Sequence, residues 1–167
     1  MAARMERCGS RTMSKRKVER LNLLKFMPFR LNRLAAEFSN ALAMEYMARF
    51  GIDIPEWRVL ATLGLHDEPR SAQYVVRCTR THKSRISRAV GALVTLGCVA
   101  RLESTDDRRE VMLELTPKGR AIYNELVPLL LKREEAILAC LTQEERAQLD
   151  HLMDKLEKSF DLVQCAD

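Results

Sequence analysis

The sequence lacks the features that mark membrane, secreted and disulfide-bonded proteins. No apolar run in the 167-residue sequence approaches the length of roughly 18 residues that a transmembrane helix needs. The first 20 residues are basic but contain no continuous apolar segment, which argues against a secretory signal. The five cysteines are odd in number and include no C-x-x-C pair, so neither a disulfide framework nor a cysteine-based zinc site is expected. These absences predict a reduced, cytoplasmic protein with no membrane association.

Catalytic and cofactor-binding motifs are also missing. The sequence contains no G-x-S-x-G, G-x-x-x-x-G-K-[ST], G-x-G-x-x-G or H-E-x-x-H. His66, His82 and His151 fall in separate segments without ligand spacing, so a metal-sensing protein would need them to converge in three dimensions. We therefore expect no enzyme activity, no catalytic residue, no cofactor and no metal site.

Charge is unevenly distributed along the chain, whose formal net charge is +5. Residues 1–20 contain seven basic and two acidic side chains, and residues 77–109 contain eight basic and three acidic ones. Residues 110–167 reverse the balance, with seven basic and twelve acidic side chains. A basic middle segment attracts a polyanion, and nucleic acid is the commonest one, although a solvated charged face has the same composition.

Apolar spacing and capping residues predict a mainly helical chain with one hairpin. Ser71 and Thr116-Pro117 are helix starts, Thr142 to Glu145 is a capping box, and Gly51 and Gly97 are helix ends. The predicted elements are helices over 21–50, from Glu56 to about Leu65, from Ser71 through Val76, over 82–96, over 117–140 and from 143 to about 162, with strands at Cys98–Leu102 and Val111–Leu115.

This order predicts a mainly α fold with a small β-wing: a winged helix-turn-helix domain over 52–116. The helices at 21–50 and 117–163 are too long and too apolar for that small module to cover, so a second copy of the chain is expected to cover them in a homodimer. Residues 1–20 lack periodicity and are interpreted as a mobile basic arm.

The helix at 82–96 has the profile of a helix that enters the major groove of double-stranded DNA. One side is apolar, and the other combines small residues that allow close approach with arginines that can contact guanine. An ordinary exposed helix face would have a similar composition. The predicted buried side holds Ile86, Ala89, Val90, Leu93 and Leu96, the outer side holds Ser84, Ser87, Arg88, Gly91 and Thr95, and Lys83 and Arg85 flank the boundary.

Asp107, Arg108 and Arg109 stand at the tip of the predicted hairpin. A basic tip beside a basic helix can reach the neighbouring minor groove, where narrow A·T-rich stretches attract arginine. Asp107 can orient one of these arginines through a charge-assisted hydrogen bond. The alternative is a solvated turn with a weak surface ion pair.

Three segments together resemble the MarR family of bacterial winged helix-turn-helix regulators: Trp57-Arg58-Val59-Leu60, KSRISRAVGALVTLGCVAR at 83–101 and DRREVMLELTPKGR at 107–120. The resemblance covers about residues 21–163. It implies a homodimer built through the first and last helices, and a repressor that leaves DNA on binding a small molecule or on oxidation. By motif position, it assigns Ser84, Arg85, Ser87 and Arg88 to the recognition helix, and Asp107 and Arg109 to the wing.

Control of DNA binding is expected to come from a small aromatic or anionic effector. The first two helices are rich in aromatic residues and methionine, and we place the pocket at Arg30, Phe38, Met44, Met47 and Trp57, although a dimer or domain core would use the same residues. Two alternatives remain open. One is a redox-sensing regulator switched at Cys78 or Cys98, and the other is an architectural DNA-binding protein without sequence preference.

Overall fold

The computed structural model describes residues 20–103, 111–160 and 162, and the chain divides into two compact units, Met1–Leu34 and Ala35–Asp167. The described part of the first unit contains a turn, in which the Lys25 amide donates to the Asn22 carbonyl at 3.1 Å, and the start of helix α1 (Met27–Phe50). The predicted helix at 21–50 therefore begins six residues later than expected. Pro28 explains this start, because proline lacks an amide hydrogen and is tolerated only in the first turn of a helix.

Helices α2 (Ile54–Gly64), α3 (Ala72–Thr79) and α4 (Lys83–Thr95) follow, and local sequence explains their boundaries. Asp53 caps α2 in a capping box with Glu56, whose amide donates to Asp53 Oδ1 at 2.9 Å. Ser71 caps α3 with its side chain alone, which accepts from the Tyr74 amide at 3.1 Å. Both caps satisfy backbone donors that the first turn of a helix leaves free. After α4, Gly97 adopts the left-handed conformation, with φ of +69°, and so prevents the helix from continuing.

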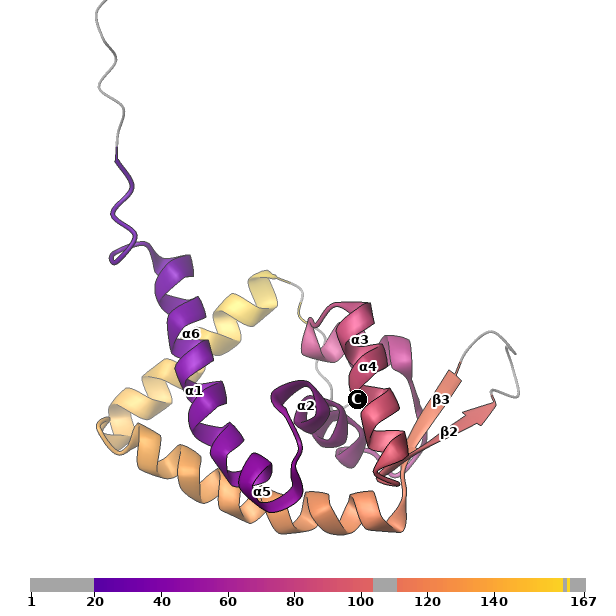
Figure 1. The fold of residues 1–167 in the computed structure, drawn as a ribbon. Helices are drawn as coiled ribbons and strands as arrows, with labels where there is room; N and C mark the ends of the chain where they lie inside the picture. Colours follow the sequence, from indigo (N-terminus) through magenta and orange to yellow (C-terminus); the bar gives the residue numbers. More distant parts are fainter. Residues whose placement is uncertain (1–19, 104–110, 161, 163–167) are drawn as a thin grey trace, which may run out of the picture. The chain divides into compact units, whose positions relative to one another are not determined.

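The described residues form a sheet of three antiparallel strands in the order β1-β3-β2, and Figure 1 shows β2 and β3 side by side. Strands β2 (Val99–Glu103) and β3 (Val111–Leu115) form the predicted hairpin, with Arg101 opposite Leu113. The sequence did not indicate β1 (Arg70–Ser71), because two residues carry no periodic signal. Residues 104–110, which include the predicted wing tip, lie outside the described residues.

The core of the second unit joins α2, α3, α4 and the sheet to the end of α1 and to α5 (Pro117–Leu138). Leu60, Leu93, Leu113 and Leu126 are fully buried in it, one from each of four elements. Apolar burial on this scale is the main source of stability in a domain of this size. The predicted buried side of α4 is confirmed at Ile86, Ala89, Val90 and Leu93, but Leu96 is exposed because α4 ends at Thr95.

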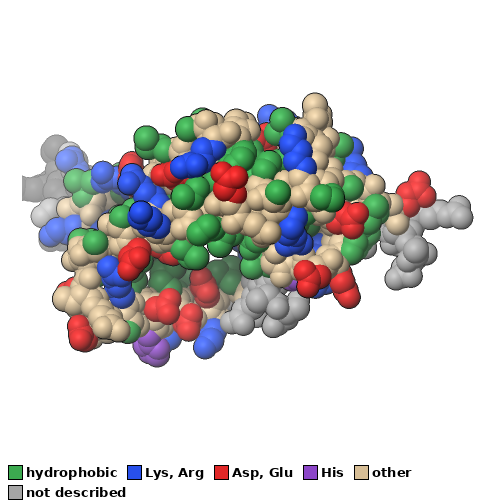
Figure 2. All heavy atoms as spheres, turned by 90° about the horizontal axis from the view of Figure 1, so that it is seen from below, with side chains coloured by type: hydrophobic (Ala, Val, Ile, Leu, Met, Phe, Trp, Pro, Cys, Tyr) green, Lys and Arg blue, Asp and Glu red, His purple; other side chains and the backbone are tan. Residues whose placement is uncertain are grey.

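The last helix, α6 (Gln143–Ser159), begins at the predicted capping box: the Glu145 amide donates to Thr142 Oγ1, and the Thr142 amide donates to Glu145 Oε2. None of its residues is buried. Hydrophobic side chains also reach the surface among charged ones on the face drawn in Figure 2. Among the described helices, none is both long and apolar enough to cross a membrane.

Candidate nucleic-acid interface

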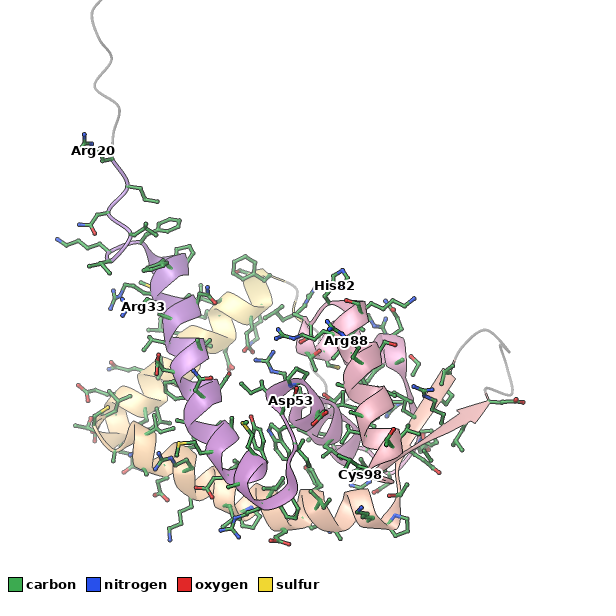
Figure 3. The ribbon with its side chains drawn as sticks, viewed as in Figure 1. Arg20, Arg33, Asp53, His82, Arg88 and Cys98 are labelled. Carbon is green, nitrogen blue, oxygen red and sulfur yellow. The ribbon has the colours of Figure 1, made fainter. Side chains whose placement is uncertain are left out.

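The turn between α3 and α4 sets the direction of α4. Arg80 adopts the left-handed conformation, with φ of 49°, at the end of α3. This conformation is uncommon for a residue with a side chain. Thr81 is buried directly after it and donates to the Thr79 carbonyl at 3.2 Å. His82 then caps α4, where its Nδ1 lies 2.8 Å from Ser84 Oγ (Figure 3). The two helices and this tight turn form the predicted helix-turn-helix.

The N-terminal half of α4 exposes every residue that the sequence assigned to DNA contact there: Lys83, Ser84, Arg85, Ser87 and Arg88. Gly91 lies one turn further along the same side and is half-buried, and a Cβ added to it would meet nothing within 4 Å. Arg88 Nε donates to the Ser84 carbonyl at 3.4 Å, so its guanidinium is held close to the helix. The exposed face therefore has small side chains in its centre and cationic side chains at its edges.

Segments adjacent to α4 in the sequence also carry exposed cations. Arg77 at the end of α3 and Arg101 on β2 are exposed, as is Arg80. Within the described part of 77–103, Glu103 is the one carboxylate. A cationic surface of this kind suits the phosphate backbone of a nucleic acid. The other predicted contacts, Asp107, Arg108 and Arg109, lie outside the described residues, so their assignment stays a prediction.

Two hollows flank α4. One, of about 280 Å³, lies between α3, α4 and the sheet, with Lys83, Ser87 and Arg101 in its lining. The other, of about 360 Å³, lies between α4 and the start of α2, where Arg85 and Arg88 face Asp53 and Glu56. Figure 3 shows Arg88 and Asp53 on the same side of α4. Lys83 and Ser87 thus occupy one edge of the exposed face, and Arg85 and Arg88 occupy the other.

A polar joint ties the end of α4 to the start of α5. Thr116 Oγ1 donates to the Gly97 carbonyl at 2.7 Å and accepts from the Gly119 amide at 3.0 Å, so this threonine both caps α5 and anchors it. Lys118 Nζ donates to the Leu96 carbonyl at 2.6 Å. Gly119 packs directly against the Cys98 carbonyl, where a Cβ would collide with the backbone. The joint explains why this position on α5 requires glycine.

The cysteines give the redox alternative little support. Burial raises the pKa of the Cys98 thiol, and the opposing effect of Lys118 is smaller. A buried thiol with a raised pKa holds less of the reactive thiolate. Cys78 is half-buried and Cys140 is exposed, and all three described cysteines are free.

The predicted effector residues lie in different environments. Trp57 is stacked between Tyr46 and Tyr123, with ring centroids at 5.7 and 6.2 Å, and so belongs to a packed aromatic cluster. Phe38 is half-buried, whereas Met44 and Met47 are exposed. Arg30 is exposed within the first unit. The two hollows beside α4 are lined by other residues, and the predicted pocket stays a prediction.

Sequence patterns did not single out two arginines that make specific contributions in the structure, Arg101 and Arg120. Arg101 brings a cation from β2 to the edge of the α4 face, and the strand alternation alone did not separate it from any other exposed strand residue. Arg120 uses both terminal nitrogens to bind backbone carbonyls of the segment that ends α2. Carbonyl acceptors leave no mark in a sequence, so no pattern pointed to this contact.

Comparisons with known proteins agree on the family. Residues 50–110 match the MarR family model. The HTH-type transcriptional regulator PecS of Dickeya dadantii is 27% identical over 130 residues, which cover 77% of this chain and 78% of PecS.

Solved structures share the fold. A MarR/EmrR family regulator from Acinetobacter sp. ADP1 superposes with a TM-score of 0.74 at 24% identity, covering 86% of this chain and 100% of the other. Bordetella bronchiseptica BpsR, whose DNA binding is regulated by 6-hydroxynicotinic acid, superposes with a TM-score of 0.69 at 23% identity, covering 79% of this chain and 99% of BpsR. The helix-turn-helix, the sheet and these matches agree with one another: residues 50–110 of the chain match the MarR family, and the fold is that of solved winged helix-turn-helix regulators of this family.

Proposed function

We propose that this regulator is a homodimeric repressor that binds a pseudo-palindromic operator and leaves it when a small aromatic or anionic effector binds. The observation that carries the proposal is the exposed face of α4, where small residues lie between Lys83 and Ser87 on one edge and Arg85 and Arg88 on the other. Small residues let a helix backbone approach base edges, and arginine can form two hydrogen bonds to guanine.

The exposed apolar side chains of α6 support a dimer. They recur at helical spacing, which places them along one side of the helix: Leu149, Leu152, Met153 and Leu156 in α6, and Phe160 directly after it. A soluble chain rarely leaves such a stripe in water, and a two-fold partner would cover it with its own copy. In such a dimer the two recognition helices would fall about 34–36 Å apart, one turn of DNA.

The test begins with selection of bound sequences from a random duplex pool. A pseudo-palindrome is expected, together with a dimer in sedimentation at micromolar concentration, and binding to the selected site should exceed binding to a scrambled duplex by about 10³ or more. A monomer, or equal affinity for both duplexes, would leave the architectural alternative as the better account.

Two arginine variants test the assigned contacts. Arg88→Ala should weaken binding to the selected site by about 1–3 kcal/mol and relax preference at one position in each half-site. Arg109→Ala should weaken binding broadly, and most at A·T-rich flanks. Lys132→Ala, which removes an exposed cation from α5, is the matched control and should bind like the wild type. Wild-type affinity in both arginine variants would remove the proposed contacts.

The effector part of the proposal draws support from the regulation of BpsR by 6-hydroxynicotinic acid. Aromatic acids should be added to the complex with DNA, using the wild type and a variant with all five cysteines changed to serine. Release from DNA in both proteins supports a ligand. Release that needs peroxide and disappears in the serine variant would assign the switch to cysteine oxidation.

A further inference from the structure

Arg120, near the start of α5, holds the end of α2 with a two-pronged contact. Its Nη1 donates to the Gly64 carbonyl at 2.7 Å, and its Nη2 donates to the His66 carbonyl at 2.8 Å. Carbonyls at a helix C-terminus lack intrahelical partners and carry partial negative charge, so a guanidinium is well suited to them. Because the guanidinium is planar and both bonds are short, the contact fixes orientation as well as distance.

Aromatic packing continues the contact between α5 and α2. The Arg120 guanidinium lies 5.8 Å from the centroid of the Tyr123 ring, and that ring stacks on Trp57 of α2. Gly64 lets Tyr123 approach, because a Cβ at this position would collide with the ring. In Figure 1, α5 passes below α2. Arg120 therefore sits at the end of a tightly packed seam between the two helices.

The segment that Arg120 holds is connected to the sheet and to α3. Arg70 Nη2 on β1 lies 3.1 Å from His66 Nδ1, and since arginine can only donate, His66 Nδ1 accepts this bond. The proton of the neutral imidazole is then on Nε2, which donates to Tyr74 Oη at 2.9 Å. His66 is buried, so this arrangement is shielded from water. A displacement of α5 at Arg120 would thus reach β1 and α3 through one residue.

We propose that Arg120 is a positioning residue that fixes the angle between α5 and the winged domain, and so sets the half-site spacing that the dimer accepts. The inference rests on the proposed dimeric operator binding. α5 leads from the winged domain towards α6 and its exposed stripe, so the α5–α2 angle determines where each α4 lies relative to the two-fold axis. One extra base pair moves a half-site by about 3.4 Å along the duplex and rotates it about the duplex axis. A small change in the angle between α5 and α2 would therefore change which half-site spacing the dimer can bind.

The experiment measures affinity for the selected operator and for duplexes whose half-sites are one or two base pairs closer or farther apart. The proteins are the wild type, Arg120→Ala, Arg120→Lys and the control Lys132→Ala. Thermal unfolding of each protein, with and without operator, is measured in parallel. The quantity compared is the ratio of affinities at the selected and altered spacings, because a loss of stability alone lowers all affinities together.

Arg120→Ala is expected to reduce this ratio by about fivefold or more, the lower end of typical coupling between sites. Arg120→Lys keeps the charge but not the two fixed bonds, so an intermediate ratio is expected, and Lys132→Ala should keep the wild-type ratio. If Arg120→Ala does not fold, the ratio of Arg120→Lys decides. Wild-type ratios in the folded Arg120 variants would overturn the inference while leaving the dimer intact. A wild type that ignores spacing would instead overturn the proposed function, and this inference with it.

Discussion

Helices α4 and α6 have similar sequence patterns and opposite surroundings. Both begin at a capping residue and carry apolar side chains at helical spacing. Leu93 of α4 is 0% exposed, whereas Leu152 of α6 is 56% exposed, and α6 has no buried residue. Apolar periodicity therefore specifies that a helix has a side to be covered, but it does not specify whether the cover belongs to the same chain.

The difference follows from what surrounds each helix. α4 packs against α2, α3 and β2 within the second unit, so its apolar side completes a core that already exists. α6 follows the long helix α5, and where the two helices connect, Arg146 Nε donates to the Leu138 carbonyl at 3.1 Å. Identical changes on the two helices should therefore act on different equilibria: folding of the winged domain for α4, and association of two chains for α6.

The largest effect is expected from truncation in the covered helix. Leu93→Ala removes a fully buried side chain and should lower the free energy of unfolding by about 3–4 kcal/mol, through lost transfer energy and a residual cavity. Leu96→Ala, at the exposed residue directly after α4, is the control and should cost less than about 1 kcal/mol. Urea unfolding measures both. Similar losses in the two variants would show that the core does not centre on α4.

A charge in the exposed stripe should act on assembly instead. Leu152→Glu places a carboxylate where a partner helix is expected, and should weaken association and operator binding by at least about 100-fold, or about 2.7 kcal/mol. Lys158→Glu, on the opposite side of α6, introduces the same side chain and should leave the dimer intact. Sedimentation measures the association of both variants, and titration with operator measures their DNA binding. A Leu152→Glu protein that remains a dimer would place the interface elsewhere.

The C-terminal half of α1 contains both covered and uncovered side chains: Met44 is 68% exposed and Tyr46 is 1% exposed. Burial raises the pKa of Tyr46 to about 12, with a smaller lowering effect from Arg58 and a raising effect from Asp53. The folded state thus holds the phenolic proton more tightly than the unfolded state, whose ordinary value is 10.0. The resulting stability is complete below about pH 10 and is lost as the pH rises towards 12.

Tyr46→Phe isolates this contribution, since phenylalanine does not ionise. Between pH 8 and about pH 11.5, the free energy of unfolding of the wild type should fall by about 2 kcal/mol more than that of Tyr46→Phe. This estimate takes about 1.36 kcal/mol for each unit by which the pKa differs between the folded and unfolded states. Denaturant unfolding at the two pH values gives the difference. Parallel losses in the two proteins would mean that Tyr46 is accessible to water.

Local signals predicted most element boundaries, because they depend on a few neighbouring residues. Ser71, Thr116 and Thr142 all cap helices where the sequence placed caps. Contacts between distant segments were not predictable: β1 exists only through its pairing with β3, and Arg120 binds carbonyls whose positions depend on the whole fold.

The candidate site shows the same division. Helical periodicity correctly placed Lys83, Ser84, Arg85, Ser87 and Arg88 on an exposed face, since that conclusion needs only the local helix and its buried side. The predicted effector residues depended on how α1 packs, and periodicity did not distinguish the buried Tyr46 from the exposed Met47 on the same helix. The tandem stacking of Tyr46, Trp57 and Tyr123 brings together side chains from three separate helices, so composition alone did not indicate it.

The smallest effect concerns the uncovered side of α4 and separates stability from binding. Gly91 lies in the helix with open space around its missing side chain, so Gly91→Ala should raise the free energy of unfolding by about 0.5–1 kcal/mol through reduced backbone entropy. If the same face approaches base edges, the added methyl group holds the backbone away, and operator affinity should fall by about tenfold, or 1.4 kcal/mol. Gly97→Ala is the contrasting variant, because its φ of +69° makes alanine strained and stability should fall instead. Thermal unfolding and operator titration of both variants supply the test: a Gly91→Ala protein that is more stable and binds DNA as well as the wild type would show that this face of α4 does not enter the groove.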